Sequence, residues 1–112
     1  MNEQRSILLV PFPFSNQSGQ KVRPVIVVSN NEFNLSGQDL IVCGITSNII
    51  SSKYSIMIEN ADMESGVLYS KSCIKADNIL KIKKSLIIKR IGTLRKQTFS
   101  TIKDKINSLF KQ

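Results

Sequence analysis

One arginine and two hydroxyl residues have the types and positions that phosphate chemistry requires. Arg23 stands before Pro24 at the start of an apolar run, and Thr46 and Ser47 end a later apolar run. Because antiparallel neighbours bring the start of one strand beside the end of the other, these side chains could meet. Arginine presents a planar set of five donors that matches a phosphate, and a hydroxyl adds one donor and one acceptor site. Together, these side chains could hold a phosphodiester.

The residue types that are missing restrict the chemistry further. The sequence contains no histidine, which excludes Cys/His zinc sites and histidine-based catalytic triads. Asp62 and Glu64 are close in sequence, but we interpret them as a solvated turn, and no metal or other cofactor is expected. RNA can still be cleaved at such a site, because its own 2′-hydroxyl is a nucleophile tethered beside the phosphorus. DNA lacks this group, so the chemistry favours RNA.

The same residues also have a purely structural interpretation. An arginine before a proline usually lies in solvent at the start of a strand, and a Thr-Ser pair at a strand end usually bonds nearby backbone groups. The two cysteines, Cys43 and Cys73, lie within apolar stretches and are predicted to be small buried hydrophobes.

Charge is distributed unevenly along the chain, which has 112 residues and a net charge of +8. Residues 1–70 hold four basic and six acidic side chains, whereas residues 71–112 hold twelve basic and two acidic ones. A basic half of this size favours a polyanionic partner, usually nucleic acid, although a solvated lysine-rich surface explains it equally well. An acidic residue and two prolines near the N-terminus predict neither a signal peptide nor a membrane anchor, so we expect a cytoplasmic protein.

Short strands and one helix must position the candidate residues. Apolar runs bounded by turn residues predict strands over 7–14, 22–29, 39–47 and 53–59, with further strand signals over 66–82 and a last strand over 85–94 that ends at Gly92. Pro11 and Pro13 cannot donate to a ladder, so the first strand is expected at a sheet edge or to carry a bulge. The segments between the strands, 15–21, 30–38 and 60–66, read as loops and turns.

The C-terminal segment changes to a helical period. Its apolar residues fall on one face at helical spacing, and they are Phe99, Ile102, Ile106, Leu109 and Phe110. Thr98 or Ser100 is expected to cap the start of this helix. We therefore predict one domain over residues 1–112, mainly β with a C-terminal helix, in which the strands form a small SH3-like barrel.

Three blocks of the sequence resemble the MazF/PemK (Kid-like) endoribonuclease toxins of type II toxin–antitoxin systems. The block "SNQSGQKVRPVIVVSNNEFN" over 15–34 is similar to the family's Arg-Pro signature, and "DLIVCGITSN" over 39–48 is similar to its Thr-containing block. A third block, "SCIKADNILKIKKSLIIKRIGTL" over 72–94, resembles the family's basic-x-Asp element with the strand after it. The order and spacing match over residues 7 to about 110.

The resemblance implies both a fold and an activity. The implied fold is the CcdB/MazF-type SH3-like barrel, assembled as a homodimer. The implied activity is sequence-specific, metal-independent cleavage of single-stranded RNA (mRNA) to 2′,3′-cyclic phosphate and 5′-hydroxyl ends, which inhibits translation and growth. The implied partners are this RNA and a cognate acidic antitoxin protein that folds on the toxin.

Site residues carry over by motif. Arg23 is implied as the central catalytic residue, with Thr46 and Ser47 positioning the scissile phosphate. Asp77 matches a candidate general base, and Lys75 stands where Kid-like members have arginine, so it keeps the charge but loses the planar fork. Four further residues are implied as contacts to RNA: Phe14, Asn16, Gln17 and Lys21.

The sequence departs from the family at its start. Family members usually begin with Gly-Asp-Ile/Val, whereas this chain has Arg5-Ser6-Ile7, a change expected to loosen the N-terminal edge.

Three competing functions stay open. CcdB-type gyrase poisons share the fold but engage gyrase through a tryptophan, which this sequence lacks. The chain could also be a basic barrel that binds RNA without cleaving it, or a toxin relative that has lost activity.

Overall fold

The computed structural model describes residues 2–12, 21–49 and 51–112. These residues form seven strands, β1 (Ser6–Phe12), β2 (Lys21–Val27), β3 (Asp39–Thr46), β4 (Ser55–Ile58), β5 (Met63–Gly66), β6 (Ser72–Lys83) and β7 (Lys89–Leu94). The helices are α1 (Asn31–Ser36) and α2 (Lys96–Leu109), with two short 3₁₀ helices, η1 (Asn60–Asp62) and η2 (Lys84–Leu86).

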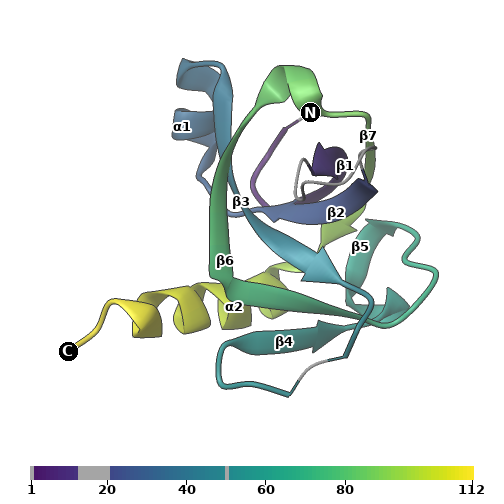
Figure 1. The fold of residues 1–112 in the computed structure, drawn as a ribbon, viewed down its shortest axis with the longest axis vertical. Coiled ribbons are helices and arrows are strands. Elements are labelled where there is room, and N and C mark those ends of the chain that lie inside the picture. The colour runs from purple at the N-terminus through teal and green to yellow at the C-terminus, as the bar shows by residue number, and fades with distance from the viewer. Residues whose placement is uncertain (1, 13–20, 50) are drawn as a thin grey trace.

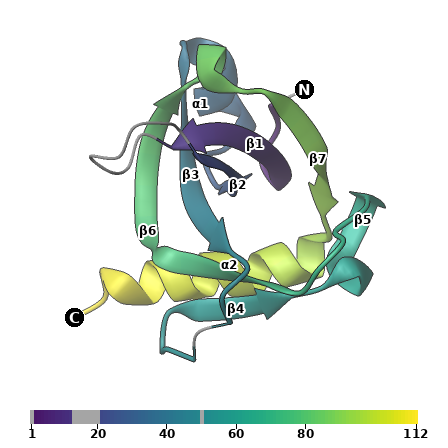
Figure 2. The same ribbon diagram turned by 45° about the vertical axis from the view of Figure 1, so that its right-hand side comes forward.

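The seven described strands pair into one antiparallel sheet in the order β4-β6-β3-β2-β1-β7-β5. The sheet curls into a half-barrel, and α2 crosses beneath it against β6 and β4 (Figures 1 and 2). The prediction of a mainly β fold with a C-terminal helix is therefore confirmed.

The central strands are buried on both faces, which explains their continuous apolar runs. One cluster lies between the sheet and α2 and contains Ile7, Ile26, Cys43, Ile45, Ile58, Met63, Ile74, Leu94, Phe99 and Ile102. The second cluster contains Leu8, Val10, Val25, Val27, Leu40 and Val42. Sequence neighbours such as Ile7 and Leu8 fall in different clusters, because successive strand residues point to opposite faces. Cys43 and Cys73 are buried and form no disulfide, as predicted.

The first strand is not at an edge of the sheet, contrary to one of the two expectations. β1 pairs with β2 on one side and with β7 on the other, and a bulge lies between Ile7 and Leu8 in the ladder with β7. The β7 ladder covers only residues 6–9 of β1, so Pro11 lies where the strand has one neighbour. Because β7 is not paired with Pro11, the missing N–H of this proline costs no ladder hydrogen bond on the β7 side of the strand.

Arg5 has a backbone conformation that favours glycine. Its φ angle is +81°, in the left-handed region that costs a residue with a Cβ about 1–2 kcal/mol. Its guanidinium donates to the Leu94 carbonyl at 2.7 Å and to the Glu64 carboxylate at 3.0 Å. Its backbone N–H also donates to the Val27 carbonyl. The hydrogen bonds from Arg5 to β2, β5 and β7 thus oppose the loosening of the N-terminal edge that the sequence led us to expect.

Three local expectations were wrong. The segment over 30–38 contains α1, because the Asn30 side chain accepts from the Phe33 N–H and caps a helical turn. The turn over 60–66 contains β5, which runs so close to β7 that a Cβ on Gly92 would lie 2.2 Å from the Ser65 carbonyl oxygen. Gly92 therefore does not end the last strand, since β7 continues to Leu94.

The C-terminal helix begins earlier than predicted and buries fewer residues. Its N-cap is Arg95, and the Thr98 hydroxyl instead donates to Asp62 at 3.0 Å. Phe99 and Ile102 are buried in the core, but Phe110 follows the end of the helix and is 74% exposed. No helix among the described residues is long and apolar enough to cross a membrane.

Candidate functional site

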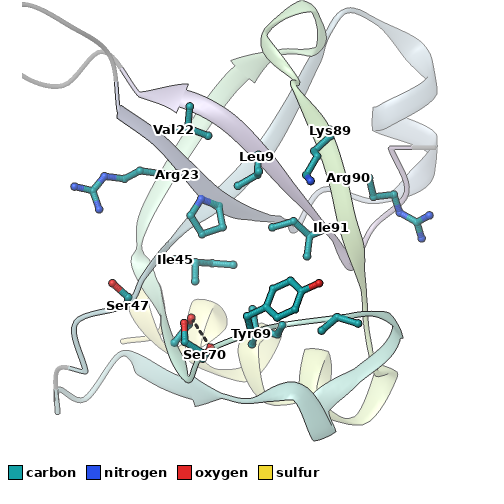
Figure 3. Close-up of a pocket in the computed structure, with 14 residues that line it drawn as sticks. Leu9, Val22, Arg23, Ile45, Ser47, Tyr69, Ser70, Lys89, Arg90 and Ile91 are labelled. Atoms are coloured by element: carbon teal, nitrogen blue, oxygen red, sulfur yellow. Dashed lines mark hydrogen bonds between the residues drawn. The ribbon is translucent and has the colours of Figure 1, made fainter.

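A groove of about 580 Å³ opens between the ends of β2 and β3, the β5–β6 loop and β7 (Figure 3). Its polar lining residues are Arg23, Ser47, Tyr69, Ser70, Ser72, Lys89 and Arg90, and its apolar ones are Leu9, Val22, Pro24, Ile45, Val67, Leu68 and Ile91. The lining residues include the cations Arg23, Lys89 and Arg90, of which Arg90 points its side chain away from the groove, and no acidic residue among those described. An anionic ligand is therefore the kind of ligand that this groove suits.

Arg23 and Ser47 reach the groove because the ladder between β2 and β3 stops short of them. The paired residues of these strands end at Val25 and Gly44. Pro24 has no N–H with which to continue the ladder. The chain is held on its other side by β1, where Val10 is the partner of Arg23. Arg23 is half-buried and Ser47 is exposed, and Figure 3 places both at the same end of the groove.

Thr46 does not line the groove, although it adjoins Ser47. Its hydroxyl accepts a hydrogen bond from the Asn48 N–H at 3.1 Å. Ile45 does line the groove, and successive strand residues face opposite sides, so Thr46 points to the other face of β3. The structure therefore brings one of the two predicted hydroxyls, Ser47, to the groove with Arg23.

Lys75 and Asp77 lie on β6, outside the residues that line the groove. Lys75 is paired with Gly44 of β3 and Ser55 of β4. Asp77 lies in an irregular stretch of β6. Gly44 and Cys43 are adjacent in β3, but their partners in β6, Lys75 and Ile79, are not adjacent to each other. A bulge of this kind redirects the side chains that it carries. Asp77 is exposed there.

The predicted RNA contacts fall mostly outside the described part of the chain. Phe14, Asn16 and Gln17 lie in the stretch 13–20, which the structure does not describe. Lys21 is exposed at the first position of β2 and is not a lining residue of the groove.

Several groove residues were not predicted from the sequence. Tyr69 and Ser70 come from the loop between β5 and β6, and Lys89 and Arg90 come from the start of β7. Lys89 and Arg90 form a basic pair at the start of an apolar strand, and Arg23 likewise stands at the start of one. This similarity could have indicated Lys89 from the sequence. Tyr69 carried no periodic signal, because its position depends on how the loop crosses the groove.

Only one pKa shift bears on the chemistry near this region. Burial, with a smaller contribution from the negative charge of Asp77, raises the pKa of the Cys43 thiol to about 12. A thiol of this kind stays protonated and is a poor nucleophile. Within the described residues, no three His, Cys, Asp or Glu side chains converge in a way that could hold a metal ion.

Comparisons with known proteins give one family. The model of the PemK-like, MazF-like toxin of type II toxin–antitoxin systems matches residues 3–110. A comparison with curated proteins gives no significant match. The solved structure of the Mycobacterium tuberculosis toxin MazF-mt6 superposes with a TM-score of 0.77 at 20% identity, covering 95% of this chain and 96% of that one.

Two further solved structures are those of complexes. A mycobacterial endoribonuclease in complex with its cognate antitoxin gives a TM-score of 0.77 at 17% identity, covering 96% of this chain and 93% of that one. A MazE–MazF structure from Deinococcus radiodurans gives 0.75 at 16% identity, covering 96% and 94%. At these identities the superpositions establish the fold alone, whereas the family model spans nearly the whole sequence. This chain therefore belongs to the PemK-like, MazF-like toxin family of type II toxin–antitoxin systems.

Proposed function

We propose that this protein is the toxin of a type II toxin–antitoxin system and cleaves single-stranded RNA in the groove that Arg23 and Ser47 share. The observation that carries the proposal is this shared groove, whose described lining residues include the cations Arg23 and Lys89 and no acid. Family membership supports the same activity, because similar structures include endoribonucleases. The groove is open at the surface, as an extended single strand requires.

The proposed reaction uses the RNA as its own nucleophile. The 2′-oxygen attacks the neighbouring phosphorus and loses its proton, the bond from phosphorus to the 5′-oxygen breaks, and that oxygen takes up a proton. The products are a 2′,3′-cyclic phosphate and a 5′-hydroxyl. Arg23 would donate to the non-bridging oxygens as negative charge builds on them, and Ser47 would add one further hydrogen bond.

Three further predicted site residues, Thr46, Lys75 and Asp77, lie outside the groove lining. Thr46 is proposed to fix the turn that presents Ser47, through its bond to the Asn48 N–H. Asp77 and Lys75, implied by the family resemblance, remain proposals as base and phosphate contact, because they lie on β6 away from the groove lining.

The proposed setting is a cytoplasmic homodimer held inactive by an antitoxin. Antitoxin complexes are known among the similar structures, since one endoribonuclease was solved with its cognate antitoxin. An acidic, flexible antitoxin segment would compete with RNA for cationic surface on the toxin. Expression of this chain alone is expected to stop growth, and co-expression of the antitoxin to restore it.

The direct test is incubation of the purified protein with a long mixed RNA in EDTA, followed by end-group analysis of the fragments. Cleavage to cyclic phosphate and 5′-hydroxyl ends is expected. Arg23→Ala should lower the rate about a hundredfold or more, because it removes the main charge-stabilising donor. Lys103→Ala is the matched control, since it removes one exposed positive charge from α2 and should leave cleavage unchanged.

Each contrary outcome has a definite meaning. RNA binding without fragments would replace this proposal with a non-catalytic RNA-binding barrel. Full cleavage by a folded Arg23→Ala protein would exclude Arg23 from the reaction. Cleavage that requires added metal would contradict the proposed metal-independent mechanism.

A further inference from the structure

Tyr69 is an exposed aromatic side chain within the candidate site. It is 93% exposed and lines the groove that contains Arg23. Figure 3 shows its ring at the opposite end of the groove from Arg23 and Ser47. A single exposed aromatic residue is common on protein surfaces, but one that lines a groove is available to contact a ligand bound there.

The loop that carries Tyr69 is held at both ends. The Leu68 N–H donates to the Asn60 side chain at 2.9 Å, and the partly buried Leu68 packs against the core. On the other side, the Ser72 hydroxyl donates to the Ser70 carbonyl at 3.2 Å. These contacts fix the backbone on each side of Tyr69. The ring is therefore presented to the groove by a preorganised backbone, which lowers the entropic cost of binding.

A cation lies on the same face of the groove. Lys89 is the direct partner of Leu9 in the ladder between β7 and β1, and both line the groove. Figure 3 shows Lys89 on the same strand as Ile91, and in this view the Ile91 side chain lies between Lys89 and the Tyr69 ring. Arg90, in contrast, points away from the groove and donates to the Thr93 hydroxyl. Lys89 is thus the cation placed to meet a phosphate beside a base on Tyr69.

We infer that Tyr69 is the stacking platform of a nucleotide subsite, on which one unpaired base of the RNA lies while Lys89 contacts a flanking phosphate. This inference rests on the proposed RNA-cleaving function and adds to it the residue that holds the substrate away from the scissile bond. An aromatic ring and a cation that line the same groove suit a single-stranded nucleotide, and the absence of acidic residues from the described lining disfavours a basic peptide.

The composition of the chain allows a direct measurement. The protein has no tryptophan and two tyrosines, so in a Tyr54→Phe variant all tyrosine emission comes from Tyr69. This variant should be titrated with 2′-O-methyl RNA homopolymers of each base, which cannot be cleaved because the nucleophile is blocked. Stacking should quench the emission saturably with at least one homopolymer, and added salt should weaken binding.

Three substitutions separate stacking from other roles. Tyr69→Ala should weaken binding about 5- to 150-fold and raise KM without lowering kcat, because the ring contributes to ground-state and transition-state binding alike. Tyr69→Phe should keep the affinity, since the ring is retained. Phe110→Ala is the control, because Phe110 is an exposed aromatic outside the groove.

The outcomes distinguish the inference from the function that it extends. If the native protein binds and cuts RNA, but emission is not quenched or Tyr69→Ala binds normally, the assignment of Tyr69 is wrong and the function stands. If the native protein neither binds nor cuts any RNA, both fail. A normal circular dichroism spectrum of Tyr69→Ala is expected, since the side chain is almost wholly in solvent.

Discussion

Arg23 in β2 and Ser47, which follows β3, line one groove, whereas Thr46, directly before Ser47, does not. Thr46 and Ser47 differ because successive side chains along β3 point to opposite faces. Arg23 reaches the groove because the ladder between β2 and β3 ends before it. Two adjacent hydroxyls that look equivalent in the sequence therefore have different surroundings.

This difference predicts opposite effects of two matched substitutions. Ser47→Ala should lower RNA cleavage about tenfold or more with little change in stability, because the exposed hydroxyl makes its proposed contact with the phosphate. Thr46→Ala should lower the free energy of unfolding by about 0.5–1.5 kcal/mol, since it removes the hydrogen bond to the Asn48 N–H. Cleavage rates and urea unfolding of both variants provide the measurement. A larger catalytic loss from Thr46→Ala than from Ser47→Ala would contradict the assignment.

The left-handed backbone at Arg5 predicts an unusual preference for glycine over alanine. Arg5→Ala should lower the free energy of unfolding by about 1–2 kcal/mol, because it removes the donors to Leu94 and Glu64 and keeps the positive φ. Arg5→Gly should be about 1 kcal/mol more stable than Arg5→Ala, since glycine adopts this conformation without a Cβ penalty. Urea unfolding of the pair tests the ranking, and equal stabilities would show that the backbone is not strained there.

The Ser6 hydroxyl is buried without a hydrogen-bond partner in the described structure, so its removal should do no harm. Ser6→Ala is expected to leave stability unchanged or raise it by up to about 1 kcal/mol, because an unsatisfied buried hydroxyl costs desolvation energy. Ser29→Ala is the contrasting control, since the Ser29 hydroxyl accepts from the Ile41 N–H at 3.0 Å and also donates to Asn34. Thermal unfolding should show a loss for Ser29→Ala alone. A comparable loss for Ser6→Ala would reveal a bond to that hydroxyl.

The buried Cys43 thiol predicts a loss of stability in alkaline solution. Its pKa is raised to about 12 by burial, so above about pH 9 the thiol ionises in the unfolded chain but stays protonated in the folded one. The unfolded state then binds fewer protons, and the free energy of unfolding should fall by up to about 1.4 kcal/mol per pH unit between pH 9 and 12. The contribution is fully present below pH 9.

Cys43→Ala isolates this contribution from the lysines and tyrosines that titrate in the same range. Urea unfolding at a series of pH values should show a shallower decline for the variant than for the native protein. Parallel declines would mean that the thiol can ionise in the folded state, through water that reaches it.

Much of the fold could be predicted because hydrophobic patterning is local. The runs around Val25 and Cys43 indicated strands, and the helical period of Phe99 and Ile102 indicated the terminal helix. The errors fell where weak local signals were decided by neighbours. The helix α1 depends on the Asn30 cap, and β5 exists because β7 lies beside it.

The sequence by itself determined the family, the strand pattern and the residue types available for phosphate chemistry, since these are properties of local order and composition. Only the tertiary structure decided which of those residues share a groove. Tyr69 and Lys89 come from distant segments that the curled sheet brings together, and Ser47 is separated from Thr46 by the pleat of one strand. Such groupings depend on register and strand twist, which follow from the packing of the whole chain and not from any single segment.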